Sequence, residues 1–304
     1  MRPWSPRISF STLACPDWSW GDIARRAAEY GYAGVEVRLI ERETDLLARP
    51  EFSDQNLSTS RTLFESHGVQ ICGLASSVRF DHADQSARDA DLAIGKRYLE
   101  LAHRLGAGFI RVFGDVLPAV EHAAARQAVI QHIARGLDAL GEHSEHRGLG
   151  VDVLIETHGD FSDSHRLLEV LTKVQHPRVG IVWDTHHPWR FCNEPLDGTY
   201  ARLKPWIRHT HWKDSSTGHQ KEKTAAEREA AARALSVNRG HREADYELFG
   251  AGEFPAAMTL KLLVDDGYTG WFSLEWEKAW HPNLADPEVA LPPFPGVLRG
   301  LLSS

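Results

Sequence analysis

The chain has 304 residues, of which 42% are hydrophobic and 25% charged, a balance typical of a globular protein with a large buried core. Its net charge of −8 is unfavourable for binding a polyanion, so nucleic acid is not expected as a partner. Three widely spaced cysteines, no apolar leader and no run of 18 apolar residues predict a cytoplasmic protein without disulfides or a membrane span.

Short apolar runs alternate with longer helix-like segments eight times along the chain. The predicted strands are 7–12, 34–39, 69–74, 108–113, 151–156, 179–184, 207–213 and 270–275. The predicted helices lie near 20–30, 55–67, 86–105, 119–146, 163–175, 196–204, 254–267 and 285–302. Strict alternation indicates parallel strands joined by crossover helices. Eight such units, with no glycine-rich phosphate fingerprint after the first strand, favour an α/β class single-domain (β/α)₈ TIM barrel over residues 1–304.

Residues 215–253 interrupt this rhythm after the seventh strand. They form a charged insertion that contains KEKTAAEREAAARAL (221–235), a segment rich in helix formers. Composition favours a solvated surface helix. Its place after a barrel strand also allows a lid over the active site, because the loops there surround the site in barrel enzymes. An interface in a homo-oligomer is a third possibility.

Acidic residues stand out near the C-terminal ends of three predicted strands. Side chains alternate between the two faces of a strand, and the apolar positions of the fifth, sixth and eighth strands leave Glu156, Asp184 and Glu275 on the opposite face. If the apolar positions pack on the helices, these carboxylates point into the barrel at its catalytic end. A lone buried carboxylate costs several kcal/mol, so three together require a cation or shared protons.

The seventh strand, IRHTHWKD (207–214), supplies a fourth ligand by the same alternation. His211 lies nearer the C-terminal end, while His209 shares its face and stays possible. Lys213 also shares that face and either binds substrate oxygens or neutralises the acidic rim. Three carboxylates and one imidazole suit Mn²⁺ best, with Mg²⁺, Co²⁺ or Zn²⁺ also possible. No cysteine pair has the spacing of a structural zinc site.

Two further polar side chains are predicted to point into the barrel. Glu36 of the second strand either contacts substrate or forms an inward ion pair with Arg38. His158, two residues past Glu156, reaches the site either as a substrate contact or as support for a ligand.

The motifs ETHGD (156–160), WDTHHP (183–188), HTHWKDS (209–215) and SLEWEKAWHP (273–282) resemble those of the xylose isomerase-like barrels. The likeness runs over essentially the whole chain from FSTLACPDWSW (10–20) onward. It implies that Glu156, Asp184, His211 and Glu275 bind the metal. It also implies that Glu156 and Glu275 form the acid/base pair beside the reacting carbon.

The same resemblance assigns two substrate contacts. His187 ends a DxxH motif at 184–187, and Arg111 lies at the end of the fourth strand in FIRVFGD (109–115). Both are expected to bind oxygens of a small carbohydrate substrate.

The predicted function is a divalent-metal-dependent isomerase or epimerase that acts on a sugar or keto-sugar through an enediolate. One alternative is a lyase or dehydratase, in which the same enolate expels a leaving group from a 3-keto-glycoside or an inosose. A distant alternative is an abasic-site endonuclease, disfavoured by the net charge and by the lack of histidine in GLASSVRF (73–80) and RVFGD (111–115). A non-catalytic metal- or sugar-binding barrel is the last possibility.

Overall fold

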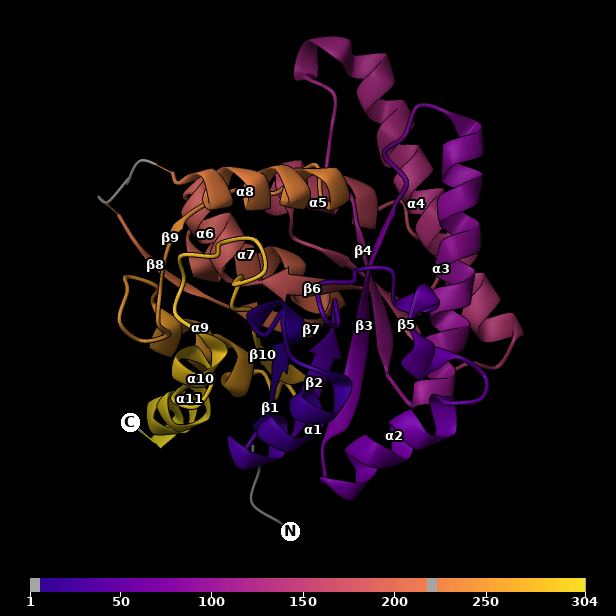
Figure 1. The fold of residues 1–304 in the computed structure, drawn as a ribbon. Helices are drawn as coiled ribbons and strands as arrows, with labels where there is room; N and C mark the ends of the chain where they lie inside the picture. Colours follow the sequence, from indigo (N-terminus) through magenta and orange to yellow (C-terminus); the bar gives the residue numbers. More distant parts are fainter. Residues whose placement is uncertain (1–5, 218–222, 304) are drawn as a thin grey trace. The chain divides into compact units, whose positions relative to one another are not determined.

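The computed structural model describes residues 6–217 and 223–303 (Figure 1). Eight parallel strands close into a barrel in the order β1-β10-β7-β6-β5-β4-β3-β2, which confirms the predicted fold class. These strands are β1 (Arg7–Ser11), β2 (Gly34–Val37), β3 (Gln70–Arg79), β4 (Phe109–Phe113), β5 (Asp152–Glu156), β6 (Val179–Asp184), β7 (Ile207–Trp212) and β10 (Trp271–Leu274).

Every predicted helix is present, and the last is divided in two around Pro292 and Pro293. The helices are α1 (Trp20–Glu29), α2 (Leu57–Ser66), α3 (Gln85–Leu105), α4 (Ala123–His146), α5 (Ser164–Leu171), α7 (Leu196–Leu203), α9 (Ala256–Asp265), α10 (Pro287–Ala290) and α11 (Phe294–Ser303). A further short helix, α6 (His186–Cys192), was not predicted. Gly106 ends α3 at φ 75°, where a residue with a side chain would be strained. None of the helices in the described ranges is long and apolar enough to cross a membrane.

One compact unit comprises the described residues of Met1–Cys72, His209–Ala232 and Glu243–Ser304. Within it β1 pairs with β2 and β10, and β10 pairs with β7. The Trp212 ring packs against Phe272, 5.8 Å between centroids, and against Phe254, 6.1 Å away. Since Trp212 lies among aromatic side chains on one face of β7, alternation places His211 and Lys213 on the other.

The second compact unit comprises Gly73–Arg208 and Arg233–Arg242. Strands β3, β4, β5 and β6 pair in sequence order, and α3 and α4 pack side by side (Figure 1). The Trp183 ring packs on Tyr200 of α7, 5.6 Å between centroids, so Asp184 points to the opposite face of β6. Val153 and Ile155 of β5 are wholly buried, and Glu156 follows them at the strand end.

The insertion contains more structure than the sequence predicts. The helix expected at 221–235 is α8 (Ala225–Val237), while residues 221 and 222 lie outside the described residues. A short antiparallel pair, β8 (Asp214–Ser216) with β9 (Asp245–Glu247), was not predicted. The Asp214 carboxylate accepts backbone N–H bonds from Gly250, Gly252 and Phe254, which fixes the return of the chain. The role of 215–253 stays a prediction.

Candidate active site

Glu36 is the centre of a buried cluster in the first unit. Its Oε2 accepts from Nε2 of His209 at 2.9 Å and from Nε2 of His211 at 2.8 Å. Burial raises the pKa of Glu36, but its charge interactions and hydrogen bonds with His211 and His209 outweigh burial and hold that pKa well below its usual range. Glu36 therefore orients two imidazoles of β7. Its predicted contact with substrate stays a prediction.

The two nitrogens of His211 face two carboxylates. Nε2 bonds Glu36, and Nδ1 lies 3.2 Å from Oε2 of Glu275. A neutral imidazole has one N–H, so with that hydrogen directed to Glu36 the Nδ1 lone pair faces a carboxylate oxygen. Two lone pairs repel at this distance, and a cation shared by them removes the repulsion. These donors therefore fit a metal ion, and Glu36 fixes the tautomer that binds one.

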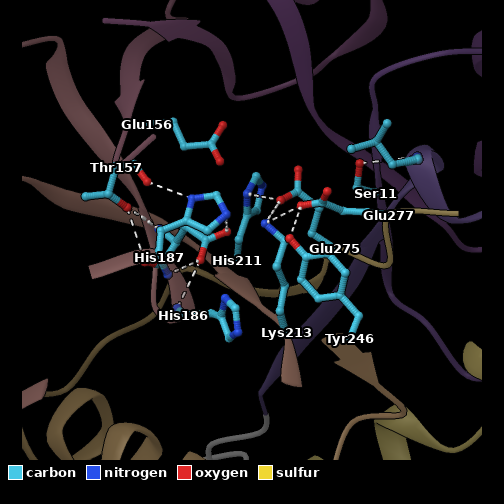
Figure 2. A network of polar contacts seen from close by, with 12 residues as sticks. Ser11, Glu156, Thr157, His186, His187, His211, Lys213, Tyr246, Glu275 and Glu277 are labelled. Carbon is cyan, nitrogen blue, oxygen red and sulfur yellow. Dashed lines mark hydrogen bonds and ion pairs between the residues drawn. The ribbon is translucent and has the colours of Figure 1, made fainter. Parts of the chain in front are cut away.

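Lys213 lies between two acidic residues that follow β10 (Figure 2). Its Nζ contacts Oε2 of Glu275 and lies 3.0 Å from Oε1 of Glu277, and the ammonium-bearing side chain is buried. The Tyr246 hydroxyl donates to Oε1 of Glu277 at 3.2 Å. Lys213 thus places one positive charge between two buried carboxylates. Glu277 was missed by the sequence reading, although it shares the parity of Glu275.

Glu156 and Arg111 form a buried pair in the second unit. Nε of Arg111 lies 3.3 Å from Oε2 of Glu156, and both residues are about 1% exposed. The guanidinium lies 3.7 Å from the centroid of the Phe113 ring, which holds it in place. The predicted substrate contact therefore lies next to one of the predicted ligands.

Asp184 is held at the first turn of α6. Its Oδ1 accepts the backbone N–H groups of His186 and His187, each at 2.9 Å. Nδ1 of His187 bonds the carbonyl oxygen of Thr157 at 2.9 Å (Figure 2). Nε2 of the same ring lies 3.4 Å from Oδ2 of Asp184. One carboxylate oxygen of Asp184 thus accepts hydrogen bonds from the backbone, and the other faces the imidazole of His187.

His158 forms a pair with Asp115, which sequence reading did not identify. His158 Nδ1 lies 2.8 Å from Asp115 Oδ1, and both residues are buried. Burial lowers the pKa of His158, but the bond and charge of Asp115 outweigh burial and raise that pKa above its ordinary value. Burial raises the pKa of Asp115, but the bond and charge of His158, followed by the charge of Arg79, outweigh burial and lower that pKa below its ordinary value. Asp115 shares the parity of Arg111, a signal that could have found it.

The predicted site residues fall into two groups, and none is more than 5% exposed. All but Arg111 lie near or past the C-terminal end of a strand; Arg111, expected at the end of the fourth strand, is the third of the five residues of β4. The first unit contains Glu36, His211, Lys213 and Glu275; the second contains Arg111, Glu156, His158, Asp184 and His187. His209, which the sequence left open as an alternative metal ligand, is buried too and bonds Glu36. The roles of these residues stay predictions.

Comparisons with known proteins agree with this fold. The sequence model of the xylose isomerase-like TIM barrel matches residues 24–291. A 3-dehydroshikimate dehydratase from Bacillus anthracis is 26% identical over 204 residues, which are 66% of this chain and 68% of that protein. An inosose dehydratase from Klebsiella pneumoniae (strain 342) is 22% identical over 244 residues, 75% of each chain.

Two solved structures have the same fold. The probable 3-DHS dehydratase AsbF from Bacillus anthracis has a TM-score of 0.73 at 19% identity, covering 96% of this chain and 98% of that one. A D-tagatose 3-epimerase-like protein has a TM-score of 0.70 at 16% identity, covering 98% and 97%. The similar proteins thus include both dehydratases and an epimerase-like protein.

Proposed function

Because the chain belongs to the xylose isomerase-like TIM-barrel family, we propose that it is a divalent-metal-dependent enzyme that enolises a hydroxylated ketone of the sugar class. Like its relatives, it is a sugar isomerase, epimerase or lyase of this superfamily. One observation carries the proposal: the consecutive barrel strands β10, β7, β6 and β5 each bear one candidate ligand at the C-terminal end. These ligands are Glu275, His211, Asp184 and Glu156.

The donor set supports a hard divalent ion, Mn²⁺ first and Mg²⁺, Co²⁺ or Zn²⁺ as alternatives. Because Nε2 of His211 bonds Glu36, Nδ1 of the same ring faces away from Glu36. The backbone N–H groups in the first turn of α6 hold one carboxylate oxygen of Asp184. When bound, such an ion supplies Lewis-acid stabilisation of negative charge on a substrate oxygen.

The protein side chains supply the proton transfer. Glu156 and Glu275 are proposed as the acid/base pair, and Arg111, His187 and Lys213 as groups that bind substrate oxygens. His158 is a second group able to transfer a proton, because a carboxylate partner orients an imidazole in general acid/base sites.

We place elimination of water first among the outcomes of enolisation. One base removes the proton next to the carbonyl, and an acid protonates the departing β-hydroxyl, which leaves a carbon–carbon double bond and water. Two separate proton-transfer groups suit this reaction, and His158 with Asp115 provides one in addition to the glutamates. Similarity to two dehydratases favours it as well.

Isomerisation or epimerisation is the second candidate, and sequence reasoning ranked it first. It begins with the same proton abstraction and returns the proton at a new position or on the other face. Similarity to an epimerase-like protein supports this candidate.

A substrate screen in D₂O tests the proposal. Metal-free enzyme is supplemented with Mn²⁺ and incubated with ketoses, inososes, 3-keto-glycosides and 3-dehydroshikimate, and products are identified by NMR. An unsaturated, ultraviolet-absorbing product indicates elimination, whereas deuterium at one carbon of an isomer indicates proton return. Glu156→Gln and Glu275→Gln should abolish turnover, and exposed Glu229→Gln should not. Full activity in both site variants would exclude this mechanism.

Other sequence predictions stay open beside this one. Two of the similar proteins are named for small hydroxylated ketones, inosose and D-tagatose, which supports a small carbohydrate as the substrate class. The absence of nucleic-acid binding, the homo-oligomer and the cytoplasmic location stay predictions. Incubation with an abasic-site duplex in the same screen tests the endonuclease alternative, and cleavage there would replace the sugar assignment.

A further inference from the structure

The turn that follows α8 packs directly on the His158–Asp115 pair. His241 N–H donates to the carbonyl oxygen of Asn238 at 3.0 Å, which makes residues 238–241 a turn with Arg239 and Gly240 at its centre. A Cβ at Gly240 would lie 2.6 Å from Gly159 Cα, 3.0 Å from Asp115 Oδ1 and 3.2 Å from His158 Nδ1. No side chain fits there without displacing the pair.

Arg239, the neighbouring turn residue, connects to the same pair through charged groups. Its guanidinium contacts Oδ2 of Asp81, and Oδ1 of Asp81 lies 3.6 Å from Nε of Arg79. Nη1 of Arg79 lies 3.6 Å from Oδ2 of Asp115. Asp81 and Asp115 have fully buried side chains, so their attractions to the mostly buried Arg79 are little screened by water. The Arg239 side chain is 44% exposed, so its attraction to Asp81 is screened more strongly.

Asp115 needs such support because its backbone is strained. Its φ is 53°, a left-handed value that is unfavourable for residues other than glycine. Its carbonyl oxygen accepts the Asp160 N–H at 2.8 Å, and a Cβ at Gly159 would lie 2.4 Å from that oxygen. A conformation of this kind costs about 1–3 kcal/mol and persists only where the surroundings hold it.

We propose that Gly240 and Arg239 are positioning residues of the active site, and that the 238–241 turn of the insertion holds Asp115 and His158 in their bonded arrangement. Gly240 allows the turn backbone to cover the pair and keep water away from the Asp115 carboxylate. Through its contact with Asp81, Arg239 holds the turn against the loop that follows β3. The proposal rests on the proposed role of His158 in proton transfer, and it gives part of the 215–253 insertion a function.

Gly240→Ala and Arg239→Gln are the test variants. Gly198→Ala is the matched glycine control, because nothing lies within 4 Å of a Cβ at that position of α7. Arg228→Gln is the matched arginine control, because Arg228 is exposed on α8. Gly240→Ala should lower kcat about 100-fold, the cost of an ångström-scale misplacement, with a smaller change in KM. Arg239→Gln should act in the same direction and Arg239→Lys should restore part of the loss.

NMR of the histidine ring protons gives a readout independent of turnover. The Nδ1–H of His158, bonded to a buried carboxylate, should give a downfield proton signal that is absent in His158→Gln. That signal should be lost in Gly240→Ala, weakened in Arg239→Gln and retained in both controls, whose melting temperature and Mn²⁺ affinity should match those of the wild type. Retention of signal and kcat in Gly240→Ala would overturn the proposal. If the wild type turns over no substrate, the proposed function fails, and the ring signal alone decides the positioning role.

Discussion

The Glu36→Gln substitution tests whether Glu36 orients a metal ligand as well as stabilising the fold. Glu36 is fully buried, and its Oε2 accepts bonds from His209 at 2.9 Å and His211 at 2.8 Å. Glutamine has the same shape but a neutral oxygen. A hydrogen bond to a charged group contributes about 1.5–3 kcal/mol and a neutral one about 0.5–1.5 kcal/mol, so each bond loses about 1 kcal/mol.

Both bonds are present without a metal and stabilise the fold, so their weakening should lower the free energy of unfolding of the metal-free protein by about 2 kcal/mol, or the melting temperature by about 4 °C. The weakening of the His211 bond should also appear in metal binding. The His211 bond fixes the tautomer and ring orientation of a proposed ligand. Residues that orient a metal ligand typically change metal affinity by about 10–100-fold when replaced, whereas a loss near 1 kcal/mol predicts a weakening of about fivefold, just below that range.

Isothermal titration of Mn²⁺ into metal-free protein measures the affinity, and thermal unfolding measures the stability. His211→Ala gives the value for a lost ligand, and exposed Glu229→Gln gives the value for a charge removed elsewhere. Unchanged Mn²⁺ affinity in Glu36→Gln, with binding abolished in His211→Ala, would refute the orienting role of Glu36. Unchanged affinity in His211→Ala would refute the ligand set itself.

Three further outcomes are expected. Chelation should abolish turnover, and Mn²⁺ at about 100 times its Kd should restore it and stabilise the fold by about 2.7 kcal/mol in thermal unfolding; a protein indifferent to chelator contradicts the metal proposal. Asp184→Asn keeps an oxygen for the α6 N–H groups but loses the charge, so titration should show Mn²⁺ binding weakened while circular dichroism stays unchanged. A Cβ at Gly73 would lie 2.2 Å from Cζ of Phe109, so Gly73→Ala should destabilise the protein by about 1–3 kcal/mol in urea, whereas Gly198→Ala should not.

The barrel could be predicted because its strands and helices obey simple local rules. The predicted strand 179–184 coincides with β6, and the helix predicted near 86–105 is α3. The third strand was predicted to end at residue 74, yet β3 continues to Arg79. Ser76 explains the difference, because its hydroxyl donates to the Arg111 carbonyl oxygen, a buried bond that hydrophobic patterning does not detect.

Candidate ligands were predictable for the same reason, and their partners were not. The alternation of side chains along single strands identified Glu156, Asp184 and Glu275. If the same alternation had been followed past the strand ends, it would also have identified Glu277 and Asp115. The bonds of Glu36, in contrast, join residues 173 and 175 positions away in the sequence. Strand register decides such pairs, and one sequence contains no local signal for it.

Gly240 illustrates a second limit of sequence reasoning. Within the insertion it looks like an ordinary turn glycine, since its place at the end of a helix explains it fully. Only the close approach of its backbone to Gly159 and Asp115 shows that neighbouring residues also require a glycine there. A glycine required by a neighbour and a glycine required by its own turn are identical in the sequence.

The bonds around the candidate ligands have a common consequence for metal binding. His211 is oriented by Glu36, and Asp184 by the backbone of α6, so both are held by groups other than the metal. Ligands fixed in this way lose little conformational freedom when an ion binds, which favours affinity. Metal-free protein should therefore keep both bonded arrangements, and removal of the ion should cost activity without loosening the strand ends that bear them.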